Sequence, residues 1–144
     1  MNTSKLPPIT LTTENYRVLA GMVDKTAAAA PYLSEFLSRE IDRASVVKPE
    51  QIDSGVVTLG SSVMFRSSDR TRAIQLVYPP EENILAGRLS ILTPVGIALI
   101  GLSIDDEMEW STRDGRTLGL KVLDVPYQPE AVAFGKGKRL ALAR

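Results

Sequence analysis

The chain has 144 residues, 17 basic and 17 acidic side chains, and 44% apolar residues, which is typical of one globular domain or of a small domain with an appendage. It contains neither cysteine nor histidine. The chain by itself therefore cannot form disulfides, thiolate zinc sites or serine triads with an imidazole base, and it cannot carry out phosphohistidine transfer. No apolar run is long enough to span a membrane or to open a signal peptide, so we expect a cytoplasmic protein with no membrane partner.

The first 48 residues are predicted to form an N-terminal arm, residues 1–11, and a short antiparallel helical hairpin, residues 12–48. The arm is expected to join a sheet through Ile9 and Leu11. Five acidic and five basic residues balance within the hairpin. Because the two helices have one apolar stripe each and a short connection, they should pack against each other as a short coiled coil.

Periodicity and capping residues define the two helices. The first begins at Thr12 or Thr13, which can cap it, and runs to about Ala28. Its apolar stripe consists of Tyr16, Leu19, Ala20 and Val23. The second begins at Pro31, since proline is favoured at the first helical position. Its stripe consists of Leu33, Phe36, Leu37, Glu40, Ile41 and Ala44.

Residues 49–130 are predicted to form a sheet domain, because the turn formers in residues 46–54 mark a boundary. The expected strands are Val56–Leu59, Val63–Arg66, Ala73–Tyr78, Arg88–Leu92, Met108–Trp110 and Leu118–Val125. Asp114-Gly115 is the strongest hairpin signal in the chain and should join the last two strands.

The stretch Arg88–Trp110 changes its apolar period twice. A strand ends at Pro94, because proline cannot donate a hydrogen bond to a ladder. Thr93 as cap and Pro94 as first residue then begin a short helix. The acidic group that follows is either a solvated turn or an acidic edge for a basic partner, and consists of Asp105, Asp106 and Glu107.

The predicted sheet domain and the C-terminal tail differ in charge. Residues 49–130 carry seven basic and twelve acidic side chains, a net charge of −5. The tail, residues 131–144, has four basic side chains and no acidic one. We interpret it as a flexible basic tail in solvent, with a weak contact to nucleic acid or to an acidic partner as the alternative.

Several motifs occur in a characteristic order. They are Thr93-Pro94-Val95-Gly96, Ala98-Leu99, Gly101, an acidic turn, Asp114-Gly115 and Leu123-Asp124-Val125-Pro126-Tyr127. This order resembles the Gre transcript-cleavage factors and, more closely, their relatives in the Rnk family, the regulators of nucleoside diphosphate kinase. Two further motifs are similar to Rnk rather than to Gre: Val77-Tyr78-Pro79 and Gln128-Pro129-Glu130-Ala131. The resemblance covers roughly residues 11–131.

The resemblance implies a fold and a partner. The fold is α+β, a short antiparallel helical hairpin attached to an FKBP-like antiparallel sheet domain with one short helix. The partner is RNA polymerase, on which Gre factors anchor the sheet domain while the hairpin enters the secondary channel. The implied docking residues are Leu92, Thr93, Pro94, Val95 and Gly96. Gre factors often have an acidic residue where Leu92 stands, and Pro94 and Gly96 alternatively only shape the turn.

The hairpin tip departs from the Gre pattern. Gre factors carry acidic residues there that help to hold a catalytic metal in the polymerase. In this chain, Asp24 is the only acidic residue in residues 24–32, and it stands next to Lys25. The hairpin is also shorter than in Gre factors. The resemblance therefore implies a transcription regulator that does not stimulate transcript cleavage and competes with factors that do. An effect on nucleoside diphosphate kinase would be indirect.

Two further expectations follow. Composition leaves carboxylate, lysine and tyrosine chemistry and oxygen-ligand metal sites open. We nevertheless expect no enzyme, with no catalytic residue, metal, cofactor or small-molecule substrate. The alternative function is a dimerising adaptor whose hairpin pairs with another hairpin or protein through an apolar face, which consists of Tyr16, Leu19, Val23, Leu33, Phe36, Leu37 and Ile41.

Overall fold

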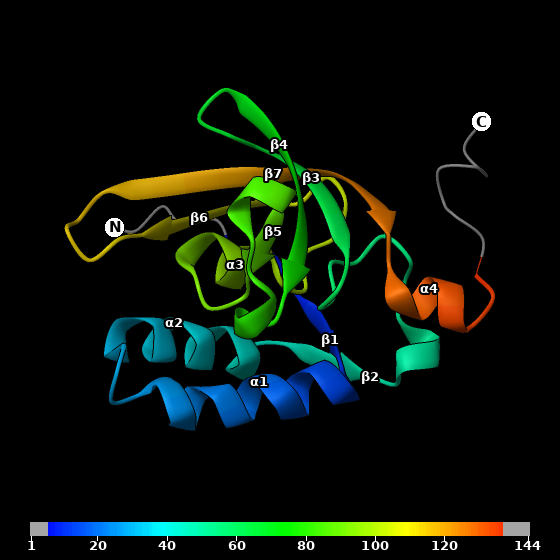
Figure 1. Cartoon of the computed structure of the whole chain (residues 1–144), viewed down its shortest axis with the longest axis horizontal. Coiled ribbons are helices and arrows are strands. Elements are labelled where there is room, and N and C mark those ends of the chain that lie inside the picture. Colours follow the sequence, from blue (N-terminus) through cyan, green and yellow to red (C-terminus); the bar gives the residue numbers. More distant parts are fainter. Residues whose placement is uncertain (1–5, 137–144) are drawn as a thin grey trace.

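The computed structural model describes residues 6–136, a mixed α+β structure with four α-helices and seven strands in that range (Figure 1). The α+β class predicted from the sequence is confirmed. In chain order the elements are β1 Thr10–Thr12, α1 Thr13–Thr26, α2 Pro31–Asp42, β2 Ser45–Val47, β3 Ser62–Ser67, β4 Arg70–Val77, β5 Arg88–Ser90, α3 Pro94–Leu99, β6 Glu107–Ser111, β7 Thr117–Tyr127 and α4 Pro129–Ala133. No helix in residues 6–136 is long and apolar enough to cross a membrane.

Helices α1 and α2 begin where the capping residues predict. The Thr12 hydroxyl accepts a hydrogen bond from the Asn15 N–H at 3.0 Å, which satisfies one of the free donors of the first turn of α1. Helix α2 begins with Pro31. The two helices lie side by side under the sheet (Figure 1), and the Ser34 hydroxyl of α2 donates to the Val23 carbonyl of α1 at 2.7 Å.

The main sheet has the strand order β5-β4-β3-β7-β6. Pairs β3–β4, β3–β7 and β6–β7 are antiparallel, but β4 and β5 are parallel. The expectation of an antiparallel sheet domain is therefore wrong for β4–β5. The reason is that residues 78–87 cross over through two 3₁₀ turns, Pro79–Glu81 and Ile84–Ala86, instead of reversing the chain in a tight turn.

The predicted strand Val56–Leu59 is wrong. Its residues are buried, but the backbone makes only an isolated bridge between Val56 and Ser103, and the Val57 N–H donates to the Leu102 carbonyl at 2.8 Å. The apolar pattern thus reflects burial in the core and not membership of a ladder.

The arm joins a small sheet. Strand β1 pairs in parallel with β2, and the Ile9 carbonyl accepts from the Ser45 N–H at 2.9 Å. Both Ile9 and Leu11 are only 1% exposed, which confirms the join predicted through these two residues.

Residues near the C-terminus form a second short helix in addition to the expected one. Helix α4 includes Ala131, which is buried, so the segment predicted as a tail begins inside a helix. The Gln128 side-chain amide donates to the carbonyls of Asp53 and Val56, at 2.8 and 2.9 Å, and holds the start of α4 against the loop before β3. The basic residues of the predicted tail beyond Lys136 lie outside the described residues.

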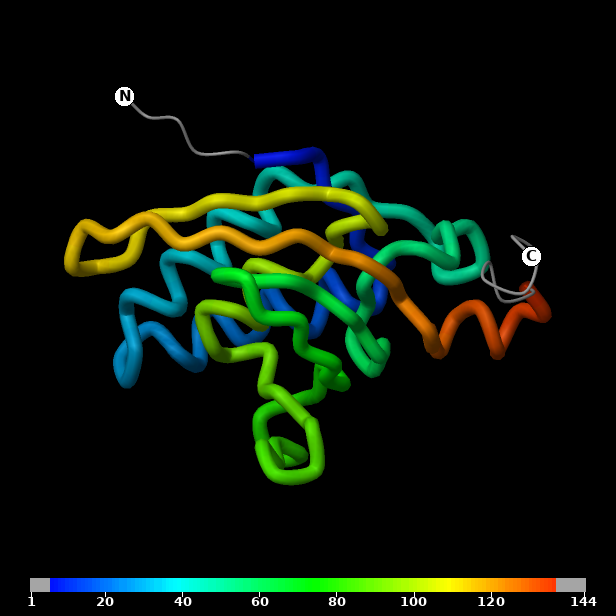
Figure 2. The backbone as a smooth tube through the Cα atoms, turned by 90° about the horizontal axis from the view of Figure 1, so that it is seen from above, coloured from blue at the N-terminus to red at the C-terminus, as the bar shows by residue number. Residues whose placement is uncertain are grey.

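One hydrophobic core joins the helices to the sheet. It includes Leu19 of α1, Phe36 and Leu37 of α2, Phe65 of β3 and Val122 of β7. The Phe36 ring also packs against the indole of Trp110 on β6, with 6.2 Å between ring centroids. Helices α1 and α2 therefore lie along the sheet and share its core (Figures 1 and 2). Apart from Tyr16, which is exposed, the apolar faces of the two helices pack within the chain.

Candidate functional site

The predicted docking residues lie where β5 turns into α3. We call residues Leu92–Gly96 the α3 corner. The Thr93 hydroxyl donates to the Ser90 carbonyl at 2.8 Å and accepts from the Gly96 N–H at 3.0 Å. Thr93 is thus the N-cap of α3, and Pro94 is its first residue, as the sequence predicts. These contacts fix the direction in which α3 leaves the sheet.

Gly96 is required by the close approach of two backbone segments. A Cβ atom at this position would lie 2.4 Å from the Ser90 carbonyl oxygen and 2.9 Å from the Ile91 Cα. Both neighbours are backbone atoms of the adjoining strand end, so they cannot rotate away. Gly96 is buried, and its role in the structure is to let α3 pack against the end of β5.

The rest of the α3 corner is partly exposed. Residues 92–95 are half-buried, and Leu92 and Val95 also pack against the core. Thr93 and Pro94 therefore offer their free sides to solvent, while Leu92 and Val95 offer only part of their side chains. The structure brings the five predicted residues together in one turn, and whether they contact a partner stays a prediction.

The helical tip has few contacts. Asp24 and Lys25 are exposed in the last turn of α1. Tyr32, at the start of α2, lies beside the β6–β7 hairpin: its hydroxyl donates to the Ser111 carbonyl at 3.4 Å, and the Arg113 guanidinium lies 5.5 Å from its ring centroid. No group of three acidic or other metal-binding side chains gathers anywhere in residues 6–136. Asp24 is the carboxylate that the tip presents.

The β6–β7 turn beside the tip is held by side chains. The Thr112 hydroxyl donates to the Asp114 carboxylate, and the Arg116 guanidinium lies 3.0 Å from that carboxylate. These two contacts, the hydroxyl first, lower the pKa of Asp114 from its ordinary value. The Asp114-Gly115 hairpin predicted from the sequence is confirmed, with Gly115 at a φ of 87°.

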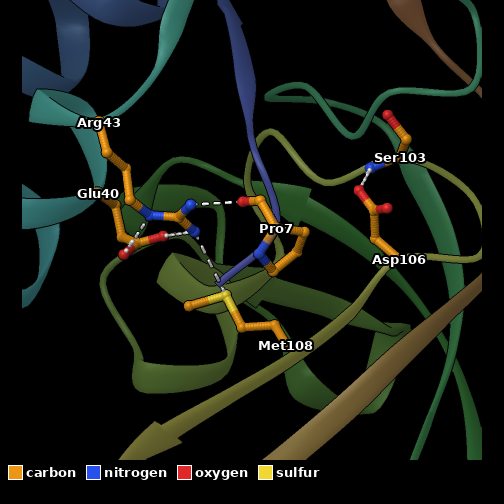
Figure 3. Close-up of polar contacts among 6 residues, drawn as sticks. All are labelled: Pro7, Glu40, Arg43, Ser103, Asp106 and Met108. Carbon is orange, nitrogen blue, oxygen red and sulfur yellow. Dashed lines mark hydrogen bonds and ion pairs between the residues drawn. The ribbon is translucent and has the colours of Figure 1, made fainter. Parts of the chain in front are cut away.

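The predicted acidic group has a structural role in part. The Asp106 carboxylate accepts a hydrogen bond from the Ser103 N–H at 2.8 Å, which closes the turn before β6 (Figure 3). Asp105 is exposed and adopts a φ of 76° in the same turn. For Asp106, these features favour the interpretation of the acidic group as a turn over its interpretation as an acidic edge for a partner.

Sequence reasoning missed a buried ion pair on α2. Glu40 has a side chain 4% exposed, and both of its oxygens accept from the Arg43 guanidinium, at 2.8 and 3.1 Å. The same guanidinium donates to the Pro7 carbonyl and lies 3.8 Å from the Met108 sulfur (Figure 3). Arg43 thus links the arm, α2 and β6. The signal was an acid and a base three residues apart, with the acid on the apolar stripe.

Comparison with known proteins shows which family has this fold. The family model "Transcription elongation factor, GreA/GreB, C-term" matches residues 52–127. The chain is 38% identical over 112 residues to the "Regulator of nucleoside diphosphate kinase" of Escherichia coli (strain K12), covering 76% of this chain and 82% of that protein. It is 35% identical over 77 residues to the "Transcription elongation factor GreA" of Zymomonas mobilis, covering about half of each protein.

A solved structure extends the likeness beyond the region of the family model. The "Prokaryotic transcription elongation factor GreA/GreB from Nitrosomonas europaea" has a TM-score of 0.66 and 34% sequence identity, and the match covers 83% of this chain and 99% of that one. These relatives are named as regulators and transcription factors and not as enzymes. The chain therefore belongs to the GreA/GreB family and, within it, to the Rnk group of regulators of nucleoside diphosphate kinase.

Proposed function

We propose that this protein is a transcription regulator that binds RNA polymerase near the secondary channel, does not stimulate transcript cleavage, and competes there with Gre factors. In this proposal residues 49–130 form an FKBP-like docking domain and residues 12–48 a short hairpin directed at the channel. The observation that carries it is the α3 corner, whose cap and glycine fix a partly exposed turn in a member of the GreA/GreB family.

The tip supports the absence of cleavage activity. A divalent cation shared with the polymerase needs several oxygen ligands. The tip presents the Asp24 carboxylate next to the Lys25 ammonium, which disfavours a second positive charge beside it. The protein would then occupy the polymerase without supplying the ligands that assist the metal, and any effect on nucleoside diphosphate kinase would be indirect.

The alternative function, a dimerising adaptor, has less support. Its apolar face is mostly in the core: Leu19 and Leu37 are 0% exposed and Ile41 is 6% exposed. Only Tyr16 of that face counts among the exposed large apolar side chains. Pairing with a second hairpin would require α1 and α2 to leave the sheet first.

Binding to purified core RNA polymerase tests the docking proposal. Pro94→Glu adds charge and length at the α3 corner, and a carboxylate at a helix N-terminus is compatible with folding. Pro129→Glu is the matched control, because Pro129 is also the first residue of a short helix, α4. We expect Pro94→Glu to weaken binding at least about tenfold, the effect of losing one close contact. Pro129→Glu should bind like the natural protein.

Two results would contradict the proposal. One is no binding of the natural protein at micromolar concentration. The other is a folded Pro94→Glu variant, checked by circular dichroism, that binds as tightly as the Pro129→Glu control.

A further inference from the structure

A groove runs between helix α2 and strand β6, with a volume of about 520 Å³. Its lining residues are Leu6, Phe36, Arg39, Glu40, Asp42, Arg43, Met108, Glu109, Trp110 and Ser111. None of them belongs to the α3 corner or to the tip residues Asp24 and Lys25. The groove is therefore a second surface, independent of the proposed docking function.

One side of the groove is a strand edge. Strand β6 is the last in the sheet order, so within the described part of the chain no strand pairs with its outer side. The Thr112 N–H, one residue after β6, donates to the Arg116 carbonyl, one residue before β7, at 2.8 Å. Because this direction alternates along an antiparallel ladder, the backbone groups of Glu109 and Ser111 point away from β7. The Ser111 carbonyl accepts a hydrogen bond from the Tyr32 hydroxyl of α2, which agrees with a carbonyl that points away from β7. An edge of this kind can accept another strand.

The groove also has an apolar side. Met108 and Trp110 alternate with Glu109 along β6, and both are buried, at 0% and 5% exposure. Phe36 of α2 packs against Trp110 and lines the same groove. The buried indole N–H of Trp110 has no hydrogen-bond partner among the described residues. Apolar side chains of an incoming strand would meet this side.

The wall formed by α2 is fixed in place. The Arg43 guanidinium holds both oxygens of the buried Glu40 and the Pro7 carbonyl, and it lies 3.8 Å from the Met108 sulfur of β6 (Figure 3), so α2, the arm and β6 meet at this residue. A groove between a helix and a sheet edge is the geometry that suits an extended peptide. Figure 2 shows β6 at the outer edge of the sheet, beside the start of the described arm.

Charge decides which strand fits. The lining contains three carboxylates and two guanidiniums, and the Glu40–Arg43 pair neutralises itself, which leaves Asp42 and Glu109 against Arg39. The Glu109 side chain lies on the outer face of the sheet, where a Cβ on Gly119 would be 3.4 Å from the Glu109 Cγ. Basic residues placed beside Glu109 would thus favour the binding of a neighbouring strand. A second copy added edge to edge in the register that pairs Glu109 with itself would place two carboxylates together, which is unfavourable.

We propose that the groove binds an extended segment of another protein, in which apolar and basic residues alternate, as a sixth strand on β6. The segment bonds to the outward N–H and carbonyl of Glu109 and to the outward N–H of Ser111, whose carbonyl already accepts from the Tyr32 hydroxyl. Its apolar side chains face Phe36 and Trp110, and its basic side chains lie on the face of Glu109.

A synthetic peptide tests this directly: acetyl-Lys-Val-Lys-Val-Lys-Val-Lys-amide, with acetyl-Val-Val-Val-Lys-Lys-Lys-Lys-amide of equal composition as its control. The chain has one tryptophan, so its emission reports on the groove without a label. We expect the alternating peptide to shift this emission in a saturable way and the control peptide to leave it unchanged. Amide exchange at Glu109 and Ser111 should slow when the peptide is bound.

Two variants separate backbone from charge. Glu109→Pro removes an outward N–H without touching the β6–β7 ladder and should weaken peptide binding about tenfold, the effect of one lost hydrogen bond and its unpaired partner. Glu109→Gln keeps the N–H and removes the charge, and should weaken binding about threefold at low salt. If Glu109→Pro does not fold, peptide binding by Glu109→Gln and the amide exchange of the natural protein still test the proposal.

Three outcomes would overturn the proposal. They are no binding of the alternating peptide up to millimolar concentration, equal binding of the control peptide, and sedimentation showing that the protein forms dimers through β6 that exclude the peptide.

Discussion

The α3 corner and the helical tip differ in how firmly the chain builds them. At the corner, Thr93 caps α3 with two hydrogen bonds, and Gly96 allows two backbones to touch. At the tip, α2 begins after Ala30, whose side chain makes no capping bond, and Asp24 and Lys25 are exposed. The difference indicates that position is more firmly constrained at the corner than at the tip. The docking proposed for the corner needs this constraint, whereas the non-catalytic role proposed for the tip does not.

The same substitution should have opposite effects in the two regions. Gly96→Ala places a methyl group against the Ser90 carbonyl and should lower the free energy of unfolding by about 4 kcal/mol. Gly21→Ala, in α1, meets no atom within 4 Å and should raise it by about 0.5–1 kcal/mol. Urea unfolding followed by circular dichroism measures both. Equal effects of the two changes would show that the corner is not constrained.

Capping should show the same contrast with a smaller effect. Thr93→Ala removes the cap of α3 and should cost about 1–2 kcal/mol of unfolding free energy, while Thr93→Ser keeps the hydroxyl and should cost less. Ala30→Ser adds a cap to α2 and should stabilise by about 0.5–1 kcal/mol. Thermal unfolding of the three variants checks this order. A destabilising Ala30→Ser would mean that the tip is already constrained by other contacts.

Local chemistry made the corner and both long helices predictable. Thr12 and Thr93 are caps, and Pro31 and Pro94 are first helical residues, so each helix start depends on residues within one turn. The hairpin at Asp114-Gly115 depends on local geometry in the same way, since Gly115 adopts a positive φ.

Features that depend on distant residues were not predictable in this way. Val56–Leu59 is apolar like a strand, but its backbone partners come from the segment after α3. The parallel β4–β5 pair depends on a crossover whose turns do not reveal the strand direction. The groove depends on Arg43 meeting Met108, 65 residues away, which no local pattern indicates.

Transcript cleavage by stalled RNA polymerase tests the central claim most directly, because it involves both regions at once. We predict that the protein alone does not stimulate cleavage, and that it suppresses cleavage stimulated by a Gre factor as its concentration rises, with Pro94→Glu failing to suppress and Pro129→Glu suppressing normally. Stimulation of cleavage by the protein itself, or unchanged Gre activity at concentrations that saturate its binding to the polymerase, would contradict the account.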